Sequence, residues 1–244
     1  MSCETRFFPE TKFGGFSQVD STIGFYLRVN ALLTPQSVSL DVGCGRGNYH
    51  NDPVQTRRNL RTLKGRVARA IGLDIDPSAA QNPAIDEFLL LESPASPWPL
   101  PDESVDLIVS DWTLEHVTEP DFFFREARRV LRTEGFLCLR TTNAWGYVAL
   151  AARLLPERFH HRLLSWAQKT RQEKDIFPTV YRCNTFPAMR KMLARHHFFG
   201  VVFSPSGAPG YLNFSCLAYF LGLMLERLAP PPFRNTIFVF AQKQ

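Results

Sequence analysis

The sequence predicts an α/β protein built on a mostly parallel β-sheet with helices on both faces. Three observations lead to this prediction. Short apolar runs alternate along the chain with longer stretches of helical periodicity, which is the pattern of β-α-β units. A glycine-rich turn directly follows the first of these runs, as it does where a strand leads into a helix beside a ligand. Hydrophobic residues make up 45% of the 244 residues and charged residues 21%, which favours a globular core over disorder.

The apolar runs predict seven strands. An N-terminal extension, residues 1–37, precedes them, and Phe25–Leu33 within it has the periodicity of an amphipathic helix that packs on the sheet. The predicted strands lie near residues 38–42, 70–74, 87–91, 105–110, 135–141, 198–204 and 235–242.

Helical periodicity returns after the fifth predicted strand, near residues 144–170, and again at residues 186–197. Two insertions interrupt the regular alternation, at residues 144–185 and 210–232. The sequence has no internal repeat and no low-complexity linker. We therefore expect residues 1–244 to form one domain that carries these insertions.

The glycine-rich turn has the composition of a nucleoside-cofactor site. The sequence VSLDVGCGRGNY places an acidic residue, Asp41, ahead of alternating Gly43, Gly45 and Gly47. Glycines let a ligand approach bare backbone N–H groups near the start of a helix. The second apolar run ends on Asp74, and an acidic side chain at such a strand tip can bind both hydroxyls of a ribose. The spacing is G-x-G-x-G and differs from the G-x-G-x-x-G of dinucleotide binders.

Four segments in this order resemble the class I S-adenosylmethionine-dependent methyltransferases. The first is the acid-x-G-x-G-x-G motif that begins at Asp41, and the second is AIGLDID, Ala70–Asp76. The third, Pro97–Val117, is similar to the family's fourth-strand region, and the fourth, Phe123–Asn143, to the helix, turn and fifth strand that follow. The resemblance implies a Rossmann-like, seven-stranded sheet with an antiparallel last strand and helical lid insertions. It also implies an enzyme that uses S-adenosylmethionine (SAM) as its methyl donor.

The same resemblance implies a set of cofactor contacts at the strand ends. Asp41 would orient the methionine amine, Asp74 would bind the ribose hydroxyls and Ile75 would flank the adenine. The family's acidic residue after the third strand is missing, because that stretch reads LLLESPASPW, so the adenine contact stays open between Glu92, Ser93 and backbone. The implied cofactor residues are Asp41, Gly43, Cys44, Gly45, Asp74, Ile75, Ser110 and Trp112.

A candidate base follows the fourth predicted strand. A sulfonium methyl group is already activated, so such an enzyme mainly aligns an acceptor and excludes water. A hydroxyl acceptor also needs a general base. His116 is the candidate, because its imidazole titrates near neutrality, and a purely structural role for it is the alternative. Tyr181 is the next candidate, since the positive charge of the neighbouring Arg182 would lower the pKa of its phenol.

The insertion over residues 144–185 is a predicted lid. In the resembling fold, the segment after the fifth strand lies beside the cofactor's methyl group. Near the end of this insertion, Tyr181, Arg182 and Asn184 bring together a phenol, a guanidinium group and an amide, which can orient an anionic or polyhydroxylated acceptor. The alternative is a turn that ties the lid down through the same polar groups.

The insertion over residues 210–232 holds an apolar stretch of about 15 residues, which is shorter than the ~20 residues needed to span a bilayer. Two interpretations stay open. The stretch is a buried helix or a homodimer face, or residues 211–229 form an interfacial helix in peripheral contact with a membrane.

The net charge is +5, and basic residues cluster between the glycine-rich turn and the second strand. A solvated helix face and an attraction to phosphates are the competing interpretations. No aromatic residue lies within the cluster, which disfavours binding of single-stranded nucleic acid by stacking. The cluster consists of Arg57, Arg58, Arg61, Lys64, Arg66 and Arg69.

The five cysteines show no C-x-x-C pair and no metal-ligand spacing. The sequence therefore predicts neither a metal site nor a disulfide framework, and it favours a reducing cytoplasm. The N-terminus has no apolar segment of the kind that secretory signals carry. We expect a cytoplasmic protein, with contact to the inner face of the membrane as the open alternative.

The N-terminal extension is similar to that of a group of bacterial methyltransferases with the pattern GGF-x-x-VD-x-TI-x-FY, which Gly14–Tyr26 matches. Members often accompany genes for envelope glycans, which implies a small-molecule or glycan acceptor, and we expect its acceptor atom to be a hydroxyl oxygen. The alternatives are a membrane-associated lipid or quinone methyltransferase and a SAM-binding protein without turnover.

Overall fold

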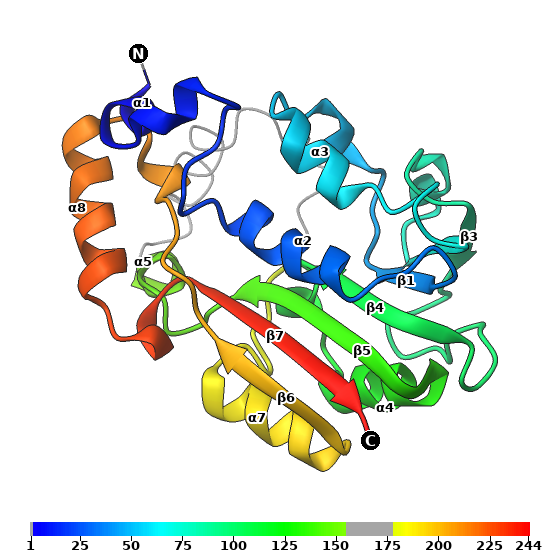
Figure 1. The fold of residues 1–244 in the computed structure, drawn as a ribbon. Coiled ribbons are helices and arrows are strands. Elements are labelled where there is room, and N and C mark those ends of the chain that lie inside the picture. The colour runs from blue at the N-terminus through cyan, green and yellow to red at the C-terminus, as the bar shows by residue number, and fades with distance from the viewer. Residues whose placement is uncertain (1, 155–177) are drawn as a thin grey trace.

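The computed structural model describes residues 2–154 and 178–244. Its centre is a seven-stranded sheet of order β3-β2-β1-β4-β5-β7-β6 (Figure 1). Strands β1 to β5 pair in parallel, whereas β7 runs antiparallel to both of its neighbours, β5 and β6. The strands are β1 (Val38–Val42), β2 (Arg69–Asp74), β3 (Glu87–Leu90), β4 (Val105–Asp111), β5 (Leu131–Thr142), β6 (Phe198–Phe203) and β7 (Thr236–Lys243).

Helices cover both faces of the sheet (Figure 1). Helices α2 and α3 pack on one face and α4 and α7 on the other, and each pair closes its own apolar core. The two cores follow the alternation of side chains along a strand, since Leu107 and Val109 of β4 join one core and Ile108 joins the other. The described helices are α1 (Cys3–Phe7), α2 (Ser21–Ala31), α3 (Gln55–Arg61), α4 (Pro120–Val130), α5 (Tyr147–Leu154), α7 (Phe186–Arg195) and α8 (Cys216–Leu228).

Side-chain caps explain where helices α2 and α7 begin. The Asp20 carboxylate caps α2 by accepting hydrogen bonds from the backbone N–H groups of Thr22 and Ile23. Thr185 caps α7 in the same way through the N–H of Ala188. Helix α2 therefore starts four residues before the predicted Phe25, because the cap and not the apolar pattern sets its first turn.

The predicted fold class is confirmed, and all seven predicted strands are present. Strand β5 starts at Leu131, four residues before the predicted start, because Leu131 already pairs with Val105 before a register shift. The last two predicted strands differ in direction: β7 alone runs against the sheet, and β6 at the edge follows the parallel set. Helix α5 begins the helical segment expected near 144–170, and the rest of that expectation, from 155 on, lies outside the described residues.

The apolar insertion contains α8, which packs against α1 at one end of the molecule (Figure 1). Its inward side chains, Tyr219 and Leu223, are buried, whereas Leu217 and Leu221 are 69% and 53% exposed. One face of this helix is therefore buried, as the core interpretation expects, and the other face is exposed. None of the described helices is long and apolar enough to cross a membrane.

A disulfide joins Cys3 of α1 to Cys216 of α8. The prediction of a chain without disulfides is therefore wrong at this pair. The two residues are 213 positions apart and show no spacing motif, so only the packing of α1 against α8 brings them together. The remaining cysteines, Cys44, Cys138 and Cys183, are free and buried.

Candidate functional site

The carboxyl ends of β1, β2, β4 and β5 meet at one edge of the sheet, and the glycine-rich turn lies over this edge. Gly43 leaves β1 with a φ of 78°, and its N–H donates to the Leu73 carbonyl of β2 at 2.8 Å. A Cβ atom on Gly43 would collide with the Thr113 side chain, and one on Gly47 would collide with Asn82. Glycine is therefore required at both positions, because the neighbouring side chains leave no room for a Cβ atom and because the backbone has a positive φ.

The Asp74 carboxylate fixes the glycine-rich turn by accepting a backbone hydrogen bond from it. One carboxylate oxygen accepts the Gly45 N–H at 2.8 Å, and the other accepts the Asp76 N–H at 2.9 Å. Each carboxylate oxygen has two lone pairs, so both oxygens keep an acceptor position for a ligand hydroxyl. The neighbouring Ile75 is 40% exposed, which leaves an apolar surface beside this carboxylate.

Asn82 is a residue of this turn that the sequence analysis missed. Its side chain is buried, and its amide N–H₂ donates to the carbonyls of Cys44 and Gly45, both at 3.1 Å. Its amide oxygen accepts the Ala84 N–H at 2.9 Å. The position needs a donor and an acceptor at once, which an amide supplies. The dipeptide Asn82-Pro83 in the sequence was the available signal for a structured turn.

Asp41 and Cys44 present different chemistry. The Cys44 thiol is buried, and burial raises its pKa, so Cys44 contributes its backbone and not a nucleophile. Asp41 is half-buried on the α2 and α3 face, where burial and the neighbouring Asp111 carboxylate raise its pKa to about 7. Its carboxylate makes no hydrogen bond with any other residue that the structure describes. This unpaired acid is suited to hold an ammonium group.

Asp111, at the end of β4, is the centre of a buried ion cluster that the sequence analysis did not foresee. Arg140 of β5 donates to both of its oxygens, Nε to Oδ1 at 2.5 Å and Nη2 to Oδ2 at 2.6 Å. The Tyr26 hydroxyl of α2 donates to Oδ2 at 3.0 Å. Burial would raise the pKa of Asp111, but the charge and hydrogen bonds of Arg140 hold it below its ordinary value.

Helix α2 is joined to this cluster a second time, and α3 joins it as well. The third nitrogen of Arg140, Nη1, donates to the Thr22 hydroxyl at 2.9 Å. Arg61 of α3 lies 3.4 Å from Asp111 Oδ2 and stacks over the Tyr49 ring, 4.3 Å from its centroid. The Arg61 Nε is buried and has no hydrogen-bond partner in the described part of the chain.

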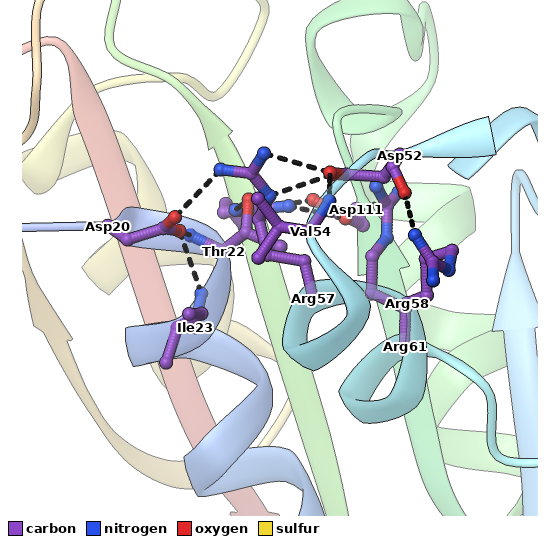
Figure 2. Close-up of polar contacts among 10 residues, drawn as sticks. Asp20, Thr22, Ile23, Asp52, Val54, Arg57, Arg58, Arg61 and Asp111 are labelled. Atoms are coloured by element: carbon purple, nitrogen blue, oxygen red, sulfur yellow. Dashed lines mark hydrogen bonds and ion pairs between the residues drawn. The ribbon is translucent and has the colours of Figure 1, made fainter. Parts of the chain in front are cut away.

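Arg57 of α3 connects two further carboxylates, as Figure 2 shows. It donates to Asp20, the cap of α2, at 2.9 Å, and through two nitrogens to Asp52 at 2.8 Å each. The Arg58 guanidinium donates to the Asp52 carbonyl. We call the set of Asp20, Asp52, Arg57, Arg61, Asp111 and Arg140 the polar network.

Part of the basic cluster seen in the sequence has partners within the fold. Besides the arginines of the polar network, Lys64 donates to the Ile85 carbonyl at 2.7 Å, and Arg69 lies 3.6 Å from Glu87. These partners favour the interpretation of a structural helix face over a surface that tracks phosphates.

The two residues predicted to line the methionine end, Ser110 of β4 and Trp112 just after it, differ in placement. Ser110 is fully buried, and its hydroxyl donates to the Val42 carbonyl at 3.0 Å, so its side chain does not face the open edge. The alternation of β4 explains this, because Ser110 points away from the face that carries Asp111. Trp112 follows with a φ of 57°, and its ring lies 5.1 Å from the Arg140 guanidinium.

The candidate bases lie on adjoining segments. His116 ends a short 3₁₀ helix (Leu114–His116), and its Nδ1 is 3.0 Å from the Pro178 carbonyl oxygen. The segment that returns from the predicted lid passes here, since the backbone N–H groups of Val180 and Tyr181 both donate to the Glu115 carbonyl. Tyr181 adopts a φ of 49°. The structure therefore brings His116 and Tyr181 to one region, after β4.

Asn184 does not have the placement predicted for a substrate-binding residue. It is fully buried, and its amide donates to the Thr141 hydroxyl at 2.6 Å, which in turn donates to the Glu115 carboxylate at 2.7 Å. This chain of hydrogen bonds ties the returning segment to β5, which favours the alternative of a structural tie over an acceptor contact for Asn184. Arg182 is exposed. The middle of the predicted lid, residues 155–177, lies outside the described residues.

The described residues show no group of three or more His, Cys, Asp or Glu side chains that could hold a metal ion.

Comparison with known proteins gives a consistent result. The sequence pattern of a family described as a methyltransferase domain matches residues 40–139. The probable S-adenosylmethionine-dependent methyltransferase Rv3030 of Mycobacterium tuberculosis (strain ATCC 25618 / H37Rv) is 32% identical over 181 residues. This alignment covers 70% of the present chain and 60% of the relative, so the chain spans about 60% of the length of this curated relative.

Solved structures show the same fold at lower identity. A chain in the complex between the Haloferax volcanii Trm112 methyltransferase activator and the putative methyltransferase superimposes with a TM-score of 0.54 at 19% identity, covering 90% of each chain. The [4+2]-cyclase SpnF superimposes with a TM-score of 0.55 at 17% identity, covering 91% of this chain and 80% of that one. Because one of these proteins is described as a cyclase, the fold alone does not determine the reaction.

Proposed function

We propose that the chain belongs to the class I SAM-dependent methyltransferases and that it transfers the methyl group of SAM to a hydroxyl of a small-molecule or glycan acceptor. The observation that carries the proposal is the glycine-rich turn fixed on Asp74, with the unpaired carboxylate of Asp41 beside it. SAM, when bound, supplies an electrophilic methyl group. The residues of the chain then have to hold the cofactor, orient the acceptor and remove its proton.

The charges at the sheet edge suit the two ends of SAM. Asp41 would accept the methionine ammonium, because ionisation of a carboxyl with a pKa of about 7 is favoured by a nearby positive charge. Arg61 keeps a buried Nε without a partner in the described part of the chain, which is a donor suited to the methionine carboxylate. Asp74 would accept the ribose hydroxyls with the lone pairs that the turn leaves free, and Ile75 would flank the adenine.

The acceptor would lie toward His116 and Tyr181. If the Nδ1 of His116 donates to the Pro178 carbonyl, the basic lone pair of the neutral imidazole is on Nε2. That tautomer suits a general base for a hydroxyl. Tyr181 is the second candidate, and the exposed Arg182 beside it would attract an anionic group on the acceptor.

Substitution of His116 by Gln tests the proposal once an acceptor has been found by screening sugars and nucleotide sugars. Gln keeps hydrogen-bonding ability but removes the base, so turnover should fall by ~10²–10⁴-fold while SAM affinity stays unchanged. Tyr181→Phe is the matched variant for the second candidate. Full turnover in the His116 variant would assign this histidine to structure, and SAM binding without turnover of any acceptor would favour a SAM-binding protein instead.

A second candidate function is methyl transfer to a lipid or quinone at a membrane surface. The observation that favours it is the outward face of α8, where Leu217, Phe220 and Leu221 are exposed. The charges of α8 agree, because its acidic Glu226 is turned inward at 3% exposure whereas Arg227 is exposed. An apolar face without exposed acidic groups and with a basic flank is suited to an anionic lipid surface.

A further inference from the structure

The N-terminal arm, residues 2–20, connects α1 to the start of α2. At its far end, Cys3 is bonded to Cys216, the first residue of α8. At its near end, the Asp20 carboxylate caps α2 and pairs with Arg57 at 2.9 Å. The arm is therefore fastened covalently at one end and by an ion pair at the other.

Between these two ends, few polar contacts join the arm to the rest of the protein. Within the described part of the chain, the hydrogen bonds of residues 2–18 all connect residues of the arm itself. Its attachment at the far end is apolar, since Phe7 stacks on Tyr219 and Phe220 at centroid distances of 5.7 and 5.9 Å. This packing brings the two cysteines together, and the disulfide then adds a covalent bond between α1 and α8.

The arm continues into a helix that forms part of the candidate site. Thr22 and Tyr26 of α2 bond to Arg140 and Asp111 at the carboxyl edge of the sheet. A change in how the arm is fastened therefore bears on a helix that lies over the edge where the cofactor residues meet.

The placement of the cysteines makes this pair the target of oxidants, because Cys216 is partly accessible and the buried Cys3 lies within disulfide reach of it. Cys216 is half-buried and is the first residue of α8, so its sulfur is the more accessible of the pair. Burial raises the pKa of Cys44, Cys138 and Cys183, which keeps these three as unreactive thiols. The oxidisable pair is thus set apart from every other cysteine of the chain.

We propose that Cys3 and Cys216 are a reversible thiol–disulfide modification site, and that oxidation of this pair staples the N-terminal arm to α8. The oxidant is a low-molecular-weight disulfide of the glutathione class. The Cys216 thiolate attacks it, forms a mixed disulfide and releases one thiol. The Cys3 thiolate then attacks the Cys216 sulfur, which releases the second thiol, so that two protein thiols are oxidised and one disulfide is reduced to two thiols. Excess reduced thiol reverses both steps.

The first test counts free thiols. The protein is equilibrated in buffers of different ratios of reduced to oxidised glutathione, quenched with acid, alkylated under denaturing conditions so that buried thiols also react, and weighed by mass spectrometry. We expect five alkylated cysteines under reducing conditions and three under oxidising conditions, with Cys3 and Cys216 as the protected pair. Five alkylated cysteines at every ratio, or protection of a different pair, would overturn the proposal.

The second test measures how firmly the arm is held. Lys12 lies in the arm and is exposed, so trypsin can report its opening. Cleavage after Lys12 should be about tenfold faster in the reduced than in the oxidised protein, because local opening controls proteolysis. Cys3→Ser and Cys216→Ser should each be cleaved fast under both conditions, and far-ultraviolet circular dichroism establishes that each variant is folded.

Phe13→Ala is the control variant, because Phe13 is an exposed side chain of the same arm and the cysteines stay intact. It should keep the redox response of the parent. Equal cleavage rates for the oxidised and reduced parent would show that the disulfide does not fasten the arm. Neither test needs a cofactor or an acceptor, so the outcome is independent of the proposed function.

Discussion

The polar network and the α1–α8 contact are held together by different physical means. In the polar network, buried charges meet fixed partners, and Arg140 alone connects Asp111 to Thr22 at hydrogen-bond distance. At the α1–α8 contact, aromatic and aliphatic side chains pack around one disulfide. Charged hydrogen bonds depend on direction, whereas apolar packing depends mainly on area. The first region can therefore specify a geometry for ligands, whereas the second fastens the N-terminal arm that leads into α2.

The largest effect is expected from Arg140→Leu. This change leaves the Asp111 carboxylate buried without its main partner, so the free energy of unfolding should fall by ~3–5 kcal/mol. The double variant Arg140→Leu with Asp111→Asn also removes the buried charge and should recover a large part of that loss. Urea unfolding measures both. A single variant within ~1 kcal/mol of the parent would mean that the network does not hold this edge of the sheet.

A pair of leucines in α8 gives the next effect and tests the other region. Leu223 is 4% exposed and packs in the α1–α8 contact, so Leu223→Ala should destabilise by ~2–5 kcal/mol. Leu217→Ala removes the same atoms from an exposed position on the same helix, and should change stability by no more than ~0.5 kcal/mol. Similar losses in thermal or urea unfolding for the two variants would contradict the assignment of an inner and an outer face.

The sequence was informative wherever neighbouring residues carry the chemistry. Strand β1 has its predicted bounds, because the turn at Gly43 ends it and leaves a recognisable motif. Asp41 and Asp74 could be placed at the sheet edge for the same reason, since each follows from the apolar run that precedes it.

The remaining parts of the site depend on partners distant in the sequence. Tyr26 and Asp111 are 85 residues apart, and no spacing rule connects them before the sheet has formed. The burial of Asn184 likewise follows from Thr141 on β5, 43 positions away. In the sequence, the polar residues beside Tyr181 favour a binding site and a structural turn equally, and the tertiary contacts of Asn184 favour the turn.

Asp74 tests the cofactor edge beside the polar network. Asp74→Ala should weaken SAM binding by ~2–4 kcal/mol, because it removes charge-assisted hydrogen bonds to the ribose and the acceptor of the Gly45 N–H. Asp74→Asn keeps one carbonyl acceptor and should lose less. Calorimetry with purified protein measures the affinities. Binding within threefold of the parent in the Ala variant would exclude the ribose role.

The raised pKa of Asp41 predicts that both protein stability and SAM affinity depend on pH, which apolar contacts alone would not cause. Its pKa is raised to about 7, so the folded protein holds a proton on Asp41 that the unfolded chain has already lost. Stability from this group is therefore present at low pH and is lost as the pH rises through about 7. The affinity for SAM depends on pH in the opposite direction and should rise with pH, because the methionine ammonium needs the ionised carboxylate.

The affinity for SAM should fall by up to about tenfold for each pH unit below the pKa of Asp41, since binding then releases one proton. Asp41→Asn removes this group from the titration, so the variant should bind SAM weakly and show a flat profile. Calorimetry between about pH 5.5 and about 8.5 spans both sides of the raised pKa of about 7. If the SAM affinity of the parent protein did not fall at low pH, Asp41 would not be the residue that binds the methionine ammonium.

The smallest effect on the folded protein, and the sharpest test of the α1–α8 region, comes from its outer surface. Leu217→Ser together with Leu221→Ser should leave thermal unfolding within about 1 kcal/mol of the parent, because both side chains are exposed. If this face contacts lipid, the same variant should lose about tenfold or more of its binding to anionic liposomes, as burial of two leucines is worth several kcal/mol. Leu27→Ser is the matched control, since Leu27 is an equally exposed leucine on α2. Loss of liposome binding in both variants would show that exposed leucines contribute wherever they lie on the surface. If the parent protein dimerises in sedimentation but does not bind liposomes, the outer face of α8 would be assigned to contact with a second copy of the chain.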